Sequence, residues 1–145
     1  MAKAAKKLDD LFHDTLKDIY FAEKKILTAL PKMAKAAQDE KLHAAFEKHH
    51  GETETHVSRL ERVFEAIDAK PQGKTCDAIL GIIEEGQEIM ADYKNSPALD
   101  VGLLAAAQAV TAAPSTWCTS SARTLTPRHG RFMVPSGWRW GFLHL

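Results

Sequence analysis

The sequence lacks several features that define large classes of proteins. Its 145 residues include only two cysteines, Cys76 and Cys118, which make neither a disulfide framework nor a pair with zinc-ligand spacing. No apolar run approaches the ~18 residues that a membrane helix needs, and the first residues contain no apolar core of a signal peptide. A formal net charge of zero removes the general argument for nucleic-acid binding. We therefore expect a cytoplasmic protein with no membrane or nucleic-acid partner and an inert thiol at Cys76.

The zero net charge is the sum of two unlike segments. Residues 1–100 contain all 19 acids and 15 bases, a net charge of −4, whereas residues 101–145 contain four arginines, no lysine and no acid, a net charge of +4. All three tryptophans also lie in the second segment: Trp117, Trp138 and Trp140. Such a change marks a domain boundary, a disordered tail or an altered reading frame. We divide the chain into a helical domain at 1–113 and an irregular tail at 114–145.

Apolar residues in the first segment recur at steps of three and four, the spacing of amphipathic helices. They predict helices at about 7–38, 40–69 and 77–93, and a fourth that begins near 98 and stops at Pro114. The inward row of the first helix is Phe12, Leu16, Ile19, Ile26, Leu30 and Met33. No strand alternation is present in these segments. The pattern predicts an all-α four-helix bundle whose fourth helix is truncated or altered.

Polar residues interrupt three of these apolar rows. Glu23 falls between Ile19 and Ile26, and Glu85 falls between Ile82 and Ile89. The apolar row of the second helix contains Leu42, Phe46, Leu60 and Val63. In its middle stand His49, Thr53 and His56, with Glu52 one step aside. Carboxylates and imidazoles that face inward from several helices are the ligand set of ferritin-like di-iron or di-manganese bundles. Each residue also has a plainer interpretation: Glu23 pairs with Lys24 or a neighbouring helix, and the histidines and Glu85 face solvent.

Three stretches carry a family resemblance: LDDLFHDTLKDIYFAEKKILTALPKMAKAA, AFEKHHGETETHVSRLERVFE and TCDAILGIIEEGQEI. Over about residues 8–110 the chain resembles the YciE/YciF family of bacterial ferritin-like stress proteins. The resemblance implies a cytoplasmic ferritin-like four-helix domain, often dimeric, with no established enzymatic activity. The metal positions it implies are Glu23, His49, Glu52 and Glu85. With His56 they form our set of candidate metal ligands, and we predict no catalytic residue.

The resemblance ends near Val110. In the family an acidic, histidine-bearing stretch follows and completes the fourth helix, whereas here the remaining residues contain no acid. We favour the hypothesis of a frameshift near this point over a native tail that docks its tryptophans on a partner. The expected function is therefore that of a stress-associated bundle protein with an incomplete di-iron or di-manganese site. The alternative is a non-catalytic helical dimer or interaction module. A homodimer is predicted in either case, because a shortened fourth helix leaves apolar faces uncovered.

Overall fold

The structure, a computed structural model, describes residues 6–112 of the chain. It contains four helices, α1 (Leu8–Ala36), α2 (Glu40–Ala66), α3 (Asp77–Asp92) and α4 (Leu99–Ala112), and no strand within those residues. The all-α bundle predicted from the sequence is confirmed. Each helix that begins and ends inside the described range does so within a few residues of the predicted bounds. The predicted irregular tail at 114–145 and the stop at Pro114 lie outside the described residues.

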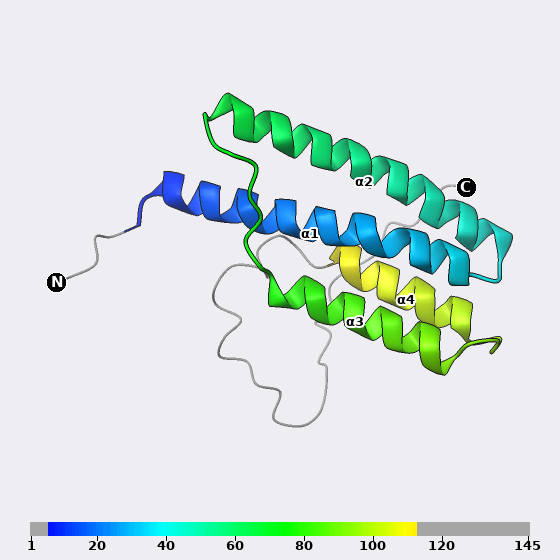
Figure 1. Cartoon of the computed structure of the whole chain (residues 1–145). Helices are drawn as coiled ribbons and strands as arrows, with labels where there is room; N and C mark the ends of the chain where they lie inside the picture. The colour runs from blue at the N-terminus through cyan, green and yellow to red at the C-terminus, as the bar shows by residue number, and fades with distance from the viewer. Residues whose placement is uncertain (1–5, 113–145) are drawn as a thin grey trace, which may run out of the picture.

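The four helices form two hairpins of unequal length. α1 and α2 have 29 and 27 residues, whereas α3 and α4 have 16 and 14. Figure 1 shows the short hairpin lying along the part of the long hairpin that carries the α1–α2 turn. We call this part, residues 26–36 and 40–50, the covered end. The opposite part, residues 8–16 and 60–66, is the open end, because α3 and α4 do not reach it (Figure 1).

The main core lies at the covered end. Leu30 and Met33 of α1 pack with Phe46 of α2 and with Leu103 of α4, which is completely buried. The remaining members of this cluster are Ala34, Leu99 and Ala106. Each large side chain buried in this way contributes roughly 1.5–3 kcal/mol. This cluster joins the two hairpins into one folded unit.

A carboxylate of α4 also binds the backbone of the α1–α2 turn. Asp100 accepts hydrogen bonds from the amides of Gln38 and Asp39, at 2.8 and 2.9 Å. Asp39 in turn caps the N-terminus of α2 by accepting from the amides of Lys41 and Leu42, each at 2.9 Å. Turn amides that would otherwise lack a partner are thus satisfied by side chains from two elements.

The connection between the hairpins, residues 67–76, runs against α1 near its middle. The amide of Lys74 donates to the carbonyl of Lys17 at 3.2 Å. A Cβ at Gly73 would lie only 3.0 Å from the Cβ of Phe21, so glycine lets the connection approach α1 this closely without displacing Phe21. At the end of the connection Cys76 is buried and disulfide-bonded, so the expectation of a free thiol there is wrong.

Two residues that the periodicity placed inward are exposed. Phe12 is 49% exposed and Val63 is 36% exposed, and both lie at the open end. They occupy the correct rows of their helices. Leu16 and Phe64 of the same end are buried, so only part of these rows is left exposed. The short hairpin of α3 and α4 does not reach this end (Figure 1).

Candidate functional site

Two of the five predicted metal ligands meet between α1 and α2. The Nδ1 atom of His56 lies 3.4 Å from Oε1 of Glu23. Glu23 is the more enclosed partner, with 22% of its side chain exposed against 46% for His56. The inward carboxylate of α1 therefore has an imidazole from α2 beside it. This arrangement agrees with the alternative in which Glu23 pairs with a neighbouring helix.

Glu52 does not join this pair. Its side chain is exposed and lies 3.8 Å from the ammonium of Lys48, one turn earlier on α2. Its neighbour Thr53 takes the inward position and is completely buried. Successive helical residues point about 100° apart, at ~3.6 residues per turn, so both cannot face α1. Glu52 is three residues after His49 and four before His56, a spacing that allows all three side chains to share one helix face. In the structure, however, the Glu52 side chain points towards solvent.

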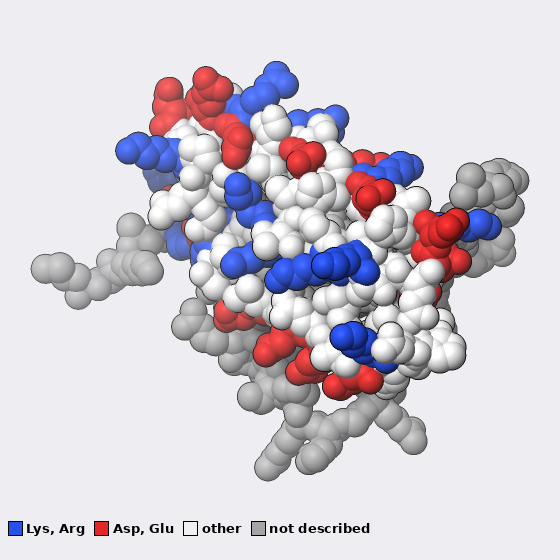
Figure 2. All heavy atoms as spheres, turned by 45° about the vertical axis from the view of Figure 1, so that its right-hand side comes forward, with Lys and Arg blue, Asp and Glu red and all other residues white. Residues whose placement is uncertain are grey.

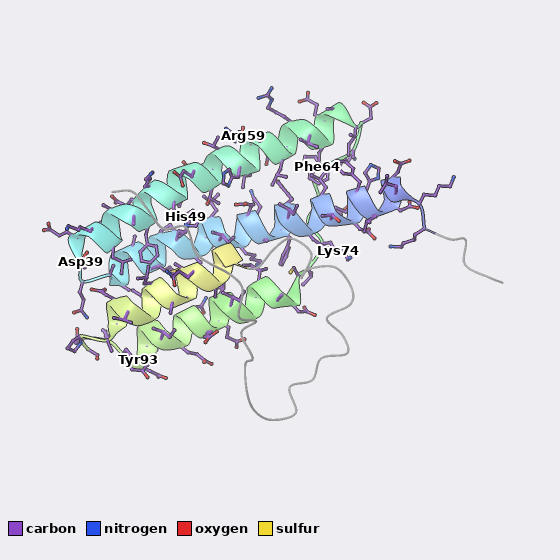
Figure 3. All side chains as sticks on the ribbon, turned by 180° about the vertical axis from the view of Figure 1, so that it is seen from behind. Asp39, His49, Arg59, Phe64, Lys74 and Tyr93 are labelled. Atoms are coloured by element: carbon purple, nitrogen blue, oxygen red, sulfur yellow. The ribbon has the colours of Figure 1, made fainter. Side chains whose placement is uncertain are left out.

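Glu85 and His49 lie apart from the pair and from each other. Glu85 is exposed on α3, while its neighbour Gly86 is the buried residue. His49 lines an internal cavity bounded by Ile26, Met33, Ile83 and Met90, among other mainly apolar residues of α1, α3 and α4. Figure 3 shows His49 on the side of α2 that faces α1. None of the other residues within 6–112 that line this cavity carries a carboxylate.

These positions do not fit a di-iron or di-manganese centre. Such a centre takes carboxylates from four helices and two histidines around one point. Within residues 6–112, no three side chains of His, Cys, Asp or Glu come together in a way that could hold a metal ion. The candidate set thus separates into the Glu23–His56 pair and three separate residues. We derive no metal-centred reaction from it.

Two buried polar side chains need a separate account. The carboxylate oxygens of Asp18 and the hydroxyl of Thr53 are buried without a hydrogen-bond partner. Burial raises the pKa of Asp18, an effect that the ammonium of Lys74, 3.8 Å away, partly offsets. Thr53 stands in the inward row already noted in the sequence. Asp18 lies off the apolar row of α1, so only the position of the 67–76 connection could have identified it.

The charged groups outside these sites are spread over the surface. Figure 2 shows one face of the molecule, on which lysine and arginine side chains form a row across the middle and aspartate and glutamate side chains follow one another below it. No helix within residues 6–112 is long and apolar enough to cross a membrane.

Fold and site together define an all-α protein of two packed helical hairpins, with the Glu23–His56 pair between α1 and α2. The sequence matches the family described as "Domain of unknown function (DUF892)" over residues 7–113, and the chain belongs to this family. Protein YciF of Escherichia coli (strain K12) is 38% identical over 106 residues, which are 72% of this chain and 64% of YciF. The chain therefore spans slightly less than two thirds of that relative. The resemblance to the YciE/YciF family is confirmed.

Solved structures of this family share the fold. YcfI from Rhodopseudomonas palustris is 36% identical, with a TM-score of 0.71 over 76% of this chain and 70% of YcfI. The crystal structure of the E. coli stress protein YciF is 37% identical, with a TM-score of 0.68 over 73% of this chain and 67% of YciF. Identity at this level supports a common fold and family.

Proposed function

We propose that this protein is a stress-associated helical module that acts through assembly with a second copy and not through a metal-centred reaction. The stress association follows from its similarity to YciF, which is described as a stress protein. The observation that carries the proposal is the uncovered apolar surface at the open end of the long hairpin.

That surface consists of residues with the spacing of a packed helix face. Leu8, Leu11 and Phe12 of α1 are 79%, 53% and 49% exposed, and the first two are three residues apart. Leu8 and Phe12 continue the row of α1 that includes Ile19 and Ile26. Contiguous apolar surface of this kind marks an interaction site. A two-fold interface would cover the open ends of two copies with each other's apolar rows.

The oligomeric state of the full chain tests this proposal. We expect sedimentation velocity at micromolar concentrations to show a dimer of the 16.0 kDa chain. The double variant Leu11→Ser/Phe12→Ser should raise the dimer dissociation constant at least tenfold, since ~1.4 kcal/mol corresponds to a factor of ten. Leu104→Ser is the matched control, because Leu104 is also about half exposed but lies on α4. A monomer across this range, or equal weakening by the control, would contradict the proposal.

A second candidate function rests on the Glu23–His56 pair. A carboxylate and an imidazole 3.4 Å apart inside a bundle are two of the groups that a di-iron or di-manganese centre uses. On this interpretation the intact family form binds the metals and this chain retains part of the site. Elemental analysis after growth with added iron and manganese separates the two functions. About two metal ions per chain, lost in Glu23→Gln, would favour the centre, whereas metal-free dimers would favour the module.

A further inference from the structure

The ring of His43, a histidine outside the candidate metal ligands, carries its hydrogen on a defined nitrogen. Nδ1 of His43, near the start of α2, lies 2.7 Å from the carbonyl oxygen of Ala34 near the end of α1. A carbonyl oxygen only accepts hydrogen bonds, so Nδ1 carries the hydrogen and donates it. In the neutral imidazole, Nε2 is then an acceptor with a free lone pair.

That lone pair faces a second acceptor. Nε2 of His43 lies 3.2 Å from Oε1 of Glu47, one turn further along α2. Two acceptors in this position attract each other only when a positive charge lies between or on them. The charge can be a proton on Nε2 or a metal ion bound to both atoms. In a tetrahedral site, two ligand atoms that each lie ~2.0–2.1 Å from the ion are about 3.3 Å from each other. The 3.2 Å between Nε2 of His43 and Oε1 of Glu47 is close to that separation.

The surroundings leave room for an ion and its other ligands. His43 and Glu47 border a surface groove of about 400 Å³ whose apolar side chains include Pro31 and Phe46. The side chain of Lys35 also borders this groove. His50, three residues after Glu47, borders the same groove and contributes a second imidazole. This groove is separate from the cavity that His49 lines, and neither Glu23 nor His56 borders it.

We propose that His43 and Glu47 bind a divalent first-row transition-metal ion of the zinc class in this groove. Imidazole nitrogen with carboxylate oxygen suits Zn²⁺, Co²⁺ and Ni²⁺. The carbonyl of Ala34 fixes the ring from the second coordination shell, as hydrogen-bonded carbonyls do for metal-binding histidines. His43 and Glu47 supply two ligands, and no three side chains of His, Cys, Asp or Glu within residues 6–112 are already grouped so that they could hold a metal ion. His50 supplies the third by turning its side chain, and water completes the coordination.

Titration of the full chain with Zn²⁺ by calorimetry tests the site, and the visible absorption of bound Co²⁺ reports its geometry. We expect one ion per chain at this groove. His43→Gln and Glu47→Gln should each weaken Zn²⁺ binding by at least ~10-fold, because even the loss of an outer-shell partner typically costs ~10–100-fold. His13→Gln is the matched control, because His13 is an exposed histidine on α1 outside the groove. Helical circular dichroism confirms that the variants fold.

Three results would overturn the proposal. The first is the absence of Zn²⁺ binding by the wild-type chain. The second is unchanged affinity in both His43→Gln and Glu47→Gln. The third is a loss of binding in His56→Gln but not in His43→Gln, which would assign the ion to the Glu23–His56 pair. Unchanged affinity in His50→Gln would overturn the assignment of the third ligand. Because the groove is remote from the open end, none of these results depends on whether the chain dimerises.

Discussion

The two ends of the long hairpin have the same sequence pattern but differ in how much of their apolar surface is covered. At the covered end, Leu30 and Met33 of α1 are 3% and 8% exposed, because α3 and α4 pack against them. At the open end, Leu8 and Phe12 continue the helical row but are about half exposed or more. An apolar row therefore shows which face of a helix needs a partner. It does not show whether the same chain supplies one.

The largest expected effect comes from emptying the core at the covered end. Leu103→Ala should lower the free energy of unfolding by ~2–5 kcal/mol, since Leu103 is completely buried. Leu11→Ala makes the same change at the open end and should cost less than ~0.5 kcal/mol in the monomer. Urea unfolding at low protein concentration measures both. Equal losses would mean that the open end is covered within one chain.

Loss of the α4 carboxylate should have the next largest effect. Asp100→Ala removes the acceptor for the amides of Gln38 and Asp39, and we expect a cost of ~1–2 kcal/mol, as for a lost helix cap. Asp92→Ala, at the exposed end of α3, is the control and should be nearly neutral. The same urea experiment distinguishes them. A neutral Asp100→Ala would show that water replaces the carboxylate without loss.

Asp18 should give a smaller effect that depends on pH. Burial raises its pKa above the ordinary 3.8, with Lys74 lowering it and Asp14 raising it. The folded state therefore binds the proton more tightly than the unfolded state does. Its stabilising contribution is full below pH 3.8 and is lost as the pH rises through the raised pKa.

Asp18→Asn removes this dependence. At neutral pH the variant should be more stable than the wild type by about 1 kcal/mol, because it removes a buried charge that Lys74 only partly offsets. The difference should shrink as the pH falls towards 3.8. Thermal unfolding of both proteins between pH 3 and 7 checks the sign, with Asp9→Asn as the exposed control. A variant that is less stable at neutral pH would show that Lys74 compensates the charge fully.

The smallest effect is expected for the Glu23–His56 pair. A double-mutant cycle with Glu23→Gln and His56→Gln should give a coupling energy below ~1 kcal/mol, because His56 is nearly half exposed and solvent screens the interaction. The cycle should be measured without added metal and repeated with manganese. A coupling energy that grows several-fold with manganese would support a metal site at this pair.

The sequence predicted the helices well because their apolar rows are long and regular. It predicted the candidate site poorly, because site geometry depends on rotations about each helix. Glu52 and Thr53 are adjacent, and which of them faces inward is decided by the packing of α2 on α1. Asp18 offered no signal, since it is buried by a connection distant in sequence. His43 was also missed, because its partner is a backbone carbonyl of another helix, which no side-chain pattern reveals.

The carboxylate of Asp100 gives this molecule a built-in reporter of hairpin separation. The amides of Gln38 and Asp39 donate to a side chain that belongs to the other hairpin. Their exchange with solvent deuterium therefore requires α4 to move away, whereas the amides within α1 and α2 are protected by their own helices. The exchange rates of these two amides would measure how often the short hairpin detaches while the long one stays folded.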